Sequence, residues 1–195
     1  MIQKNEPLLQ IISGLAAQPG SGDAIPVRMY ERGQQLIRQD QENTGVFIIR
    51  SGVVKCYITE ENGKEYVLEF LGEGEILGEL EALRKISALT TVEALTPVEA
   101  WRMNASDLLY YLQTRPDLNM AVLELLAGRL AATAVRSSRQ QLHTLSHSLA
   151  QLVGALESQQ IVFTKQDLAA YLGISIRSLN RLLQTRNGSK EELTG

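Results

Sequence analysis

The segment from residue 27 to about residue 103 is divided into short apolar runs that alternate with polar residues and are separated by glycines. Apolar residues at every second position indicate strands that bury one face. Between two of these runs, Asn62-Gly63 supplies the positive φ angles that a tight hairpin turn requires. Many short strands joined by glycine turns are typical of a small antiparallel barrel or roll.

One run shows both faces of its strand. Val54, Cys56 and Ile58 share one face, whereas Lys55, Tyr57 and Thr59 share the other. We expect Cys56 to be a small buried side chain of the roll rather than a redox sensor. It is the only cysteine of the chain, which excludes an internal disulfide and a cysteine-held iron–sulfur cluster.

Helical spacing replaces the alternation on both sides of the roll. Residues 8–18 predict a short helix, and Arg115-Pro116 precedes a long helix over 117–141. A further helix is predicted over 144–157. The fold class is therefore α+β. Its predicted domains are an N-terminal antiparallel roll over 1–116, a long dimerisation helix over 117–143 and an all-α domain over 144–195.

The long helix carries residues at alternating spacings of three and four, a pattern typical of a coiled-coil seam that weakens towards its end. Packing of this seam against a second copy would make a twofold dimer. The alternative is a helix that packs on its own roll. The predicted dimer interface consists of Leu123, Leu126, Leu130 and Thr133.

The net charge of −3 hides an asymmetry between the two parts of the chain. Residues 1–128 hold 11 Lys and Arg against 18 Asp and Glu, whereas residues 129–190 hold 8 against 2. The basic part could face a polyanion such as nucleic acid, although ordinary surface variation is the alternative. Polar residues interrupt every long apolar run, and the N-terminus has no signal-peptide pattern. We therefore expect a cytoplasmic protein without a membrane span.

Residues 164–184 carry the signals of two short helices joined by a turn. Thr164 and Asp167 predict a capping box at the start of the first helix. Gly173 supplies the positive φ angle that ends this helix, and Ser175 caps the second. Two short helices around a glycine turn form a helix-turn-helix.

The second helix presents long hydrogen-bond donors on its outward N-terminal half, as a DNA-recognition helix does. Arginine can bind O6 and N7 of guanine with two hydrogen bonds. The predicted DNA contacts are Lys165, Gln166 and Ser175 for phosphates, and Ile176, Arg177, Ser178, Asn180 and Arg181 on the recognition helix. A helical hairpin with a solvated basic face is the alternative.

Together these motifs resemble the Crp/Fnr family of transcription regulators, in which a cyclic-nucleotide-binding roll precedes a long dimerisation helix and a winged helix-turn-helix. The resemblance implies a cytoplasmic homodimer that binds a palindromic double-stranded DNA site, with RNA polymerase as a further partner. It rests on Glu31-Arg32-Gly33, Arg50-Ser51-Gly52, Glu61-Asn62-Gly63-Lys64-Glu65, Gly74, Ile76-Leu77-Gly78-Glu79-Leu80 and residues 164–183. Gly78-Glu79-Leu80-Glu81 and Tyr171-Leu172-Gly173 also resemble the YeiL-type subgroup.

The resemblance further implies an effector pocket, and here the chain departs from the family's pattern. In the family a Gly-Glu-Leu segment holds the ribose, and an arginine neutralises the cyclic phosphate. Gly78, Glu79 and Leu80 match this opening, but Ala88, followed by Leu89, stands where the arginine belongs. Thr133 matches a position that contacts the adenine. Losing a charge-assisted contact to a buried phosphate costs about 2–5 kcal/mol, so we expect cAMP to bind weakly or not at all. The roll then serves an unidentified small-molecule effector or acts as a scaffold.

The C-terminal tail differs from the family as well. Residues 185–195 contain one large apolar residue, Leu193, and cannot form the packed β-hairpin of a wing. Either the wing is missing or the chain is shortened. Because a wing adds phosphate contacts, its loss would weaken DNA affinity rather than redirect specificity.

No catalytic arrangement is evident in the sequence. His143 and His147 have a spacing that could hold a metal, but no third ligand lies nearby, so we expect no metal site. One rival interpretation is a ligand-binding regulatory module without DNA function, and the helix-turn-helix argues against it. The other is a cupin-like enzyme, which would need histidines that the roll lacks.

Overall fold

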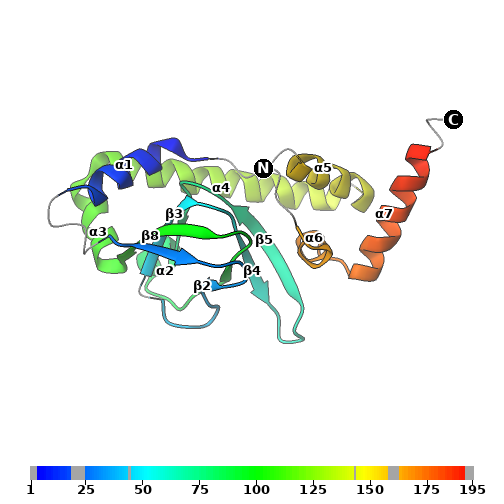
Figure 1. Cartoon of the computed structure of the whole chain (residues 1–195), viewed down its shortest axis with the longest axis horizontal. Coiled ribbons are helices and arrows are strands. Elements are labelled where there is room, and N and C mark those ends of the chain that lie inside the picture. Colours follow the sequence, from blue (N-terminus) through cyan, green and yellow to red (C-terminus); the bar gives the residue numbers. More distant parts are fainter. Residues whose placement is uncertain (1–3, 19–24, 44, 143, 158–162, 192–195) are drawn as a thin grey trace.

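A computed structural model of the chain describes residues 4–18, 25–43, 45–142, 144–157 and 163–191. The N-terminal part is a roll of two four-stranded antiparallel sheets (Figure 1), as predicted. The first sheet has the strand order β1 (Val27–Tyr30), β8 (Val98–Asn104), β3 (Gly45–Ser51) and β6 (Ile76–Leu77). The second has the order β2 (Gln35–Ile37), β7 (Thr91–Ala94), β4 (Val54–Thr59) and β5 (Glu65–Leu71).

The β4–β5 hairpin is the part of the roll that reaches the C-terminal helices. Its turn forms as predicted, because Gly63 has a φ angle of +74°. Antiparallel pairing extends from Val54 opposite Leu71 to Thr59 opposite Glu65. Helix α6 (Lys165–Leu172) packs against strand β5 of this hairpin.

Four helices surround the roll: α1 (Glu6–Ala16), α2 (Glu79–Arg84), α3 (Ala105–Thr114) and α4 (Pro116–Leu142). Helix α1 starts at Asn5, whose Oδ1 accepts a hydrogen bond from the Leu8 N–H at 3.1 Å. It lies along α4 (Figure 1) and buries its apolar face in the same core. The predicted break at Arg115 separates α3 from α4, because a proline fits the first turn of a helix but not its interior.

Helix α4 has one face that is buried against the roll and a neighbouring face that is exposed. Leu118, Val122 and Leu125 are buried in the core that the roll shares with α1. Leu123 and Leu130, by contrast, are 54% and 73% exposed. The helix thus packs on its own roll and also leaves much of the predicted seam uncovered in the single chain. Among the seam residues, Leu126 is half-buried against the core.

The same helix is apolar enough to cross a membrane by length and composition, over Pro116–Ser138 with a mean hydropathy of 1.4. The expectation of no membrane span therefore does not follow from hydropathy alone. Only 22% of that window is buried within the chain. Arg129 and Arg136 nevertheless tie the helix to the roll through hydrogen bonds to Ile76 and Leu68 carbonyl oxygens.

Three further helices form the C-terminal head: α5 (Leu145–Glu157), α6 and α7 (Ile176–Glu191). Leu149 of α5 and Leu179 of α7 are fully buried in a small core that α6 completes with Ala169 and Leu172. The core explains why these short helices are stable together, since each alone would be marginal in water. In Figure 1 the head lies at the far end of α4 from α1.

Candidate DNA interface and effector site

The capping residues of the helix-turn-helix adopt the predicted geometry. The Thr164 hydroxyl accepts from the Asp167 N–H at 3.1 Å, and the Asp167 carboxylate accepts from the Thr164 N–H at 3.1 Å. Gly173 ends α6 with a φ angle of +67°. Ser175 Oγ accepts from the Ser178 N–H at 3.1 Å and so begins α7. The two helices therefore start and end at the residues that the sequence indicated.

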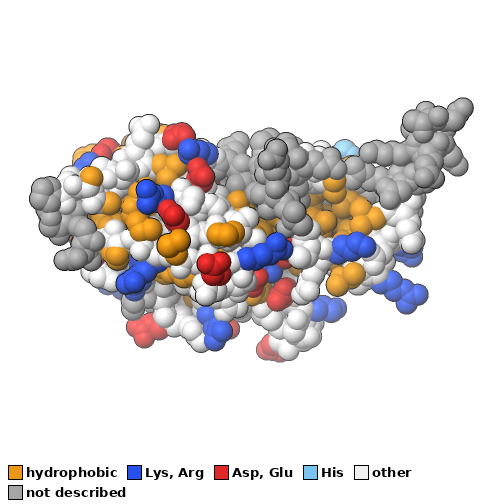
Figure 2. Space-filling model, viewed as in Figure 1, with side chains coloured by type: hydrophobic (Ala, Val, Ile, Leu, Met, Phe, Trp, Pro, Cys, Tyr) orange, Lys and Arg blue, Asp and Glu red, His pale blue; other side chains and the backbone are white. Residues whose placement is uncertain are grey.

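The predicted DNA-contacting residues lie at the surface of this head. Ser178 and Asn180 are half-buried, and the other six are exposed: Lys165, Gln166, Ser175, Ile176, Arg177 and Arg181. Lys165 Nζ donates to Asn180 Oδ1 at 3.0 Å, which ties the start of α6 to the middle of α7. In the view of Figure 2, the charged side chains at the end formed by α6 and α7 are basic. This is the charge that a phosphate backbone attracts.

Helix α7 continues to Glu191, the last residue that the structure describes. No strand that could form a wing follows α7 within the described part of the chain. Leu193 lies outside the described residues.

The predicted opening of the effector cassette sits at the start of α2. Gly78 has a φ angle of +82°, and a Cβ atom there would lie 2.6 Å from the carbonyl oxygen of Gly45, so only glycine fits. Glu79 follows and is 3% exposed. Its Oε1 lies 2.8 Å from Arg129 Nη1, and Glu75 Oε2 lies 2.5 Å from Arg129 Nη2. The cassette glutamate is therefore already paired with the protein's own guanidinium.

Carboxylates outnumber cations around Arg129. Glu69 Oε2 is a third, more distant partner at 4.0 Å from Arg129 Nε. Burial raises the pKa of Glu79 and of Glu69 above the ordinary value, and the charge of Arg129 opposes this rise in both. Burial would lower the pKa of Arg129, but Glu79 and Glu75 outweigh it and the pKa is raised. The site is an acidic cluster that one arginine holds together.

Sequence reasoning missed Arg129, although a signal was present. Arg129 follows Leu118, Val122 and Leu125 at helical spacing, so it lies on the roll-facing side of α4. A charged residue on such a stripe requires partners inside the roll, because an unpaired charge is not buried.

The position that the family fills with arginine is part of the core. Ala88 is 1% exposed and packs with Val92 and Leu77. The next residue, Leu89, is 47% exposed, but its N–H donates to Glu81 Oε1 at 3.1 Å. The Glu81 carboxylate thus already accepts the hydrogen bond that this backbone N–H donates. Leu80, on α2, is 44% exposed.

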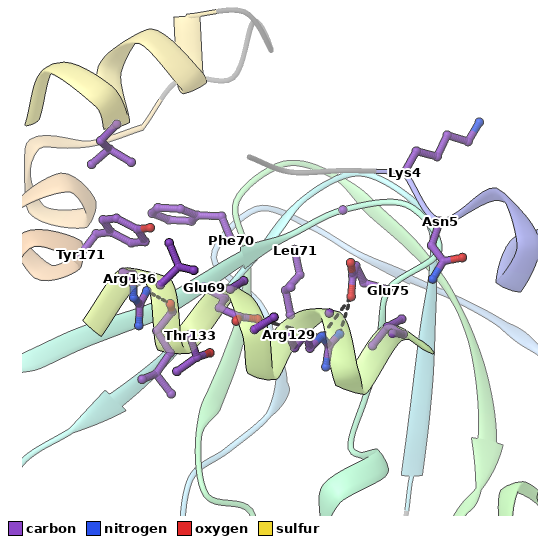
Figure 3. Close-up of a pocket in the computed structure, with 18 of the residues that line it drawn as sticks. Lys4, Asn5, Glu69, Phe70, Leu71, Glu75, Arg129, Thr133, Arg136 and Tyr171 are labelled. Carbon is purple, nitrogen blue, oxygen red and sulfur yellow. Dashed lines mark hydrogen bonds and ion pairs between the residues drawn. The ribbon is translucent and has the colours of Figure 1, made fainter. Parts of the chain in front are cut away.

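A cavity of about 830 Å³ lies between β5, α4, α5 and α6 (Figure 3). Among the six residues predicted for the effector pocket, Thr133 lines this cavity, together with Glu69, Glu75, Arg129 and Arg136. Gly78, Glu79, Leu80, Ala88 and Leu89 are not among its described lining residues. The structure therefore separates the cassette from this cavity, and Arg129, which lines the cavity, pairs with Glu79 of the cassette.

Cys56 packs against the roll core, and its Sγ lies 3.0 Å from Thr90 Oγ1. Burial raises the pKa of its thiol to about 11. The thiol is therefore protonated at neutral pH, as fits a packing role. Among the described residues, no group of three or more His, Cys, Asp or Glu side chains is arranged so that it could hold a metal ion, and His143 lies outside these residues.

Comparison with known proteins agrees with this architecture. Residues 27–115 match the cyclic nucleotide-binding domain family. The chain is similar to CLP of Xanthomonas campestris, a c-di-GMP-responsive global regulator, with a TM-score of 0.77 and 20% identity over 86% of this chain and 89% of that one. No curated protein matches the sequence.

Two further structures have the same fold. A regulator of the Crp/Fnr family from Eubacterium rectale gives a TM-score of 0.76 and 18% identity over 86% of this chain and 81% of that one. The catabolite activator protein of Thermus thermophilus gives 0.55 and 22% over 95% and 88%.

Residues 27–115 thus match the cyclic nucleotide-binding domain by sequence, and the similar structures show the same fold around them. The chain has the fold of the Crp/Fnr transcription regulators over most of its length, and the resemblance to this family predicted from the sequence is confirmed. The resemblance to the YeiL-type subgroup stays a prediction.

Proposed function

We propose that the chain is a dimeric, sequence-specific DNA-binding transcription regulator of the Crp/Fnr type that acts in the cytoplasm and is not an enzyme. The observation that carries the proposal is the capped helix-turn-helix, whose second helix exposes Arg177 and Arg181 one turn apart. Two such helices related by a dyad would enter successive major grooves, about 34 Å apart.

Arg177 and Arg181 are expected to read bases, whereas Lys165 is expected to contact a phosphate. Replacing either arginine with alanine should cost about 1–3 kcal/mol of binding free energy and relax preference at one base position. Lys165→Ala should weaken binding to all sequences about equally and flatten its salt dependence. The measurement is titration of labelled DNA, selected with the wild-type protein, at several salt concentrations. Unchanged binding by both arginine variants would contradict the assignment of α7 as the reader.

We further propose that the regulator does not respond to cAMP. Glu79, Glu81 and Glu75 surround the cassette, and Arg129 is engaged by two of these carboxylates. A cyclic phosphate would therefore meet repulsion from these carboxylates. The nearest other cations in the sequence, Arg84 and Lys85, are exposed at the end of α2. Calorimetric titration with cAMP should show no saturable binding at micromolar concentration. A submicromolar dissociation constant would contradict this prediction.

The cavity beside α4 supports a different small-molecule effector. Its size suits an organic ligand, and its lining combines apolar residues with polar side chains such as Thr133 and Gln151 and with charged ones such as Glu75 and Arg136. Native mass spectrometry of the purified protein would show a retained ligand together with the oligomeric state.

A further inference from the structure

The outer face of the β4–β5 hairpin carries a buried contact to the DNA-binding head. Lys55 of β4 and Asp167 of α6 are 112 residues apart in the chain, yet Lys55 Nζ lies 3.0 Å from Asp167 Oδ1. The same ammonium lies 3.2 Å from Glu93 Oε1 of β7. Lys55 and Asp167 are only 7% and 4% exposed. Water is therefore largely excluded from this ion pair.

Apolar and aromatic contacts surround the pair. Tyr57 and Val67 of the hairpin bury Ala170 of α6. The ring of Tyr171 stacks on Phe70 of β5, with ring centroids 5.3 Å apart and an interplanar angle of 20°. The head therefore adheres to the roll over several residues, and the ion pair sits within that contact.

Helix α4 joins the same contact through Arg136. Its guanidinium lies 5.1 Å from the centre of the Tyr171 ring and 5.8 Å from that of Tyr66, and it donates to the Leu68 carbonyl oxygen. Roll, dimerisation helix and head thus meet at one place, which Figure 3 shows beside the cavity.

Asp167 couples this contact to the helix-turn-helix itself. Besides Lys55, its carboxylate accepts hydrogen bonds from the Thr164 N–H and, at 2.6 Å, from the Thr164 hydroxyl. Asp167 is thus both a member of the capping box of α6 and the residue that Lys55 of the roll contacts. Helix α6 in turn is joined to α7 through Lys165 and Asn180. The Lys55–Asp167 pair is therefore one of the contacts that connect the roll to α7 through α6.

The docked head keeps its reading surface exposed. Arg177 and Arg181 are exposed while Asp167 and Ala170 are buried, so the docking face and the reading face of the head are different. DNA could therefore approach without undocking the head from the roll.

Both members of the pair remain charged at neutral pH. Burial would lower the pKa of Lys55, but Asp167 and Glu93 outweigh it, and the pKa is raised. Burial would raise the pKa of Asp167, but Thr164 and Lys55 outweigh it, and the pKa is lowered. Removing the ammonium would leave two carboxylates facing each other across the contact, which disfavours the docked position.

We propose that Lys55 is a positioning residue for DNA binding. Through Asp167 it fixes each head on its own roll, so that a dimer presents two recognition helices at the separation of a twofold DNA site. This inference rests on the proposed function. A fixed separation between the two recognition helices strengthens binding to the second half-site, because that step depends on the effective concentration of the second head there. It does not matter for a single half-site.

The test compares two DNA duplexes, one with both half-sites and one with a single half-site. Lys55→Met should weaken binding to the full site by about tenfold or more and leave half-site binding within about twofold of wild type. Lys55→Arg should restore most of the full-site affinity, because it retains the charge. Lys64→Met is the matched control, since Lys64 is exposed on the same hairpin and its loss should not change the ratio of the two affinities.

Equal losses on the two duplexes, or no loss, would overturn the proposal. A second measurement needs no DNA. Spin labels at residues 61 and 184 report the distance between hairpin and α7, and Lys55→Gln should broaden its distribution, whereas an unchanged distribution would also overturn the proposal. If the wild-type protein binds neither duplex, the proposed function fails, and the distance measurement still decides whether Lys55 positions the head.

Discussion

Replacing Arg129 with leucine is expected to lower the free energy of unfolding at neutral pH by about 3–5 kcal/mol. The guanidinium pairs with Glu79 at 2.8 Å and with Glu75 at 2.5 Å, and Glu79 is 3% exposed. Leucine would leave both carboxylates in a poorly hydrated place without their counter-charge. Removing one partner of a buried ion pair is costly even where the intact pair adds little net stability. Chemical denaturation of the two proteins measures the difference.

The loss of stability in Arg129→Leu should depend on pH, and the direction of this dependence identifies its cause. Without Arg129 the pKa of Glu79, which burial already raises, should rise further. A carboxyl group with a folded pKa above its unfolded value destabilises the fold when ionised, and the penalty is relieved as pH falls from the folded towards the unfolded pKa. The deficit should therefore shrink between pH 7 and about pH 5.

Arg115→Leu is the matched control. Arg115 pairs with Asp117 at 2.7 Å, but both side chains are largely solvated, so its loss should change stability little at either pH. A deficit of Arg129→Leu that is unchanged by pH would contradict the charge-based account.

Leu123→Glu combined with Leu130→Glu is expected to convert the proposed dimer into monomers. The two leucines are 54% and 73% exposed in the single chain, so their replacement should not disturb the core. In a twofold interface four leucine side chains would be lost and like charges brought together. The dimer dissociation constant should therefore rise by about a hundredfold or more. Sedimentation at several protein concentrations measures it.

Met29→Glu is the control for general effects of removing an exposed apolar side chain, since Met29 on β1 is 75% exposed and lies outside the seam. Leu126 is less suited to the test than the sequence suggested, because it also packs against the core. A double variant that dimerises like wild type would mean that the seam is not the interface.

The fold was largely predictable because its signals are local. The signals are the alternation of apolar and polar residues along the strands, the Asn62-Gly63 turn and the proline after Arg115. Each acts through the backbone of a few neighbouring residues. The same holds for the capping box of Thr164 and Asp167 and for the helix end at Gly173. These elements therefore appear where the sequence placed them.

The partners of the side chains were less predictable because they are distant in sequence. Alternation put Lys55 and Tyr57 on the face opposite Val54, but it did not reveal that α6 covers that face. The sequence showed that Ala88 stands where the family has an arginine. Its burial in the core was not predictable, because it depends on how β7 pairs with β2 and β4. Arg129 likewise acquires its role only when α4 lies on the roll.

Binding of the dimer to DNA with altered spacing tests the central claim most directly. A site selected from random DNA should contain two inverted half-sites whose centres lie about 34 Å apart, one helical turn. Inserting about 5 base pairs places the half-sites on opposite faces of the duplex, and the affinity should fall to that of a single half-site. Inserting a full turn of about 10 base pairs restores the face but not the separation, so affinity should stay low. Affinity that does not depend on spacing, or selection that yields no inverted repeat, would contradict the account.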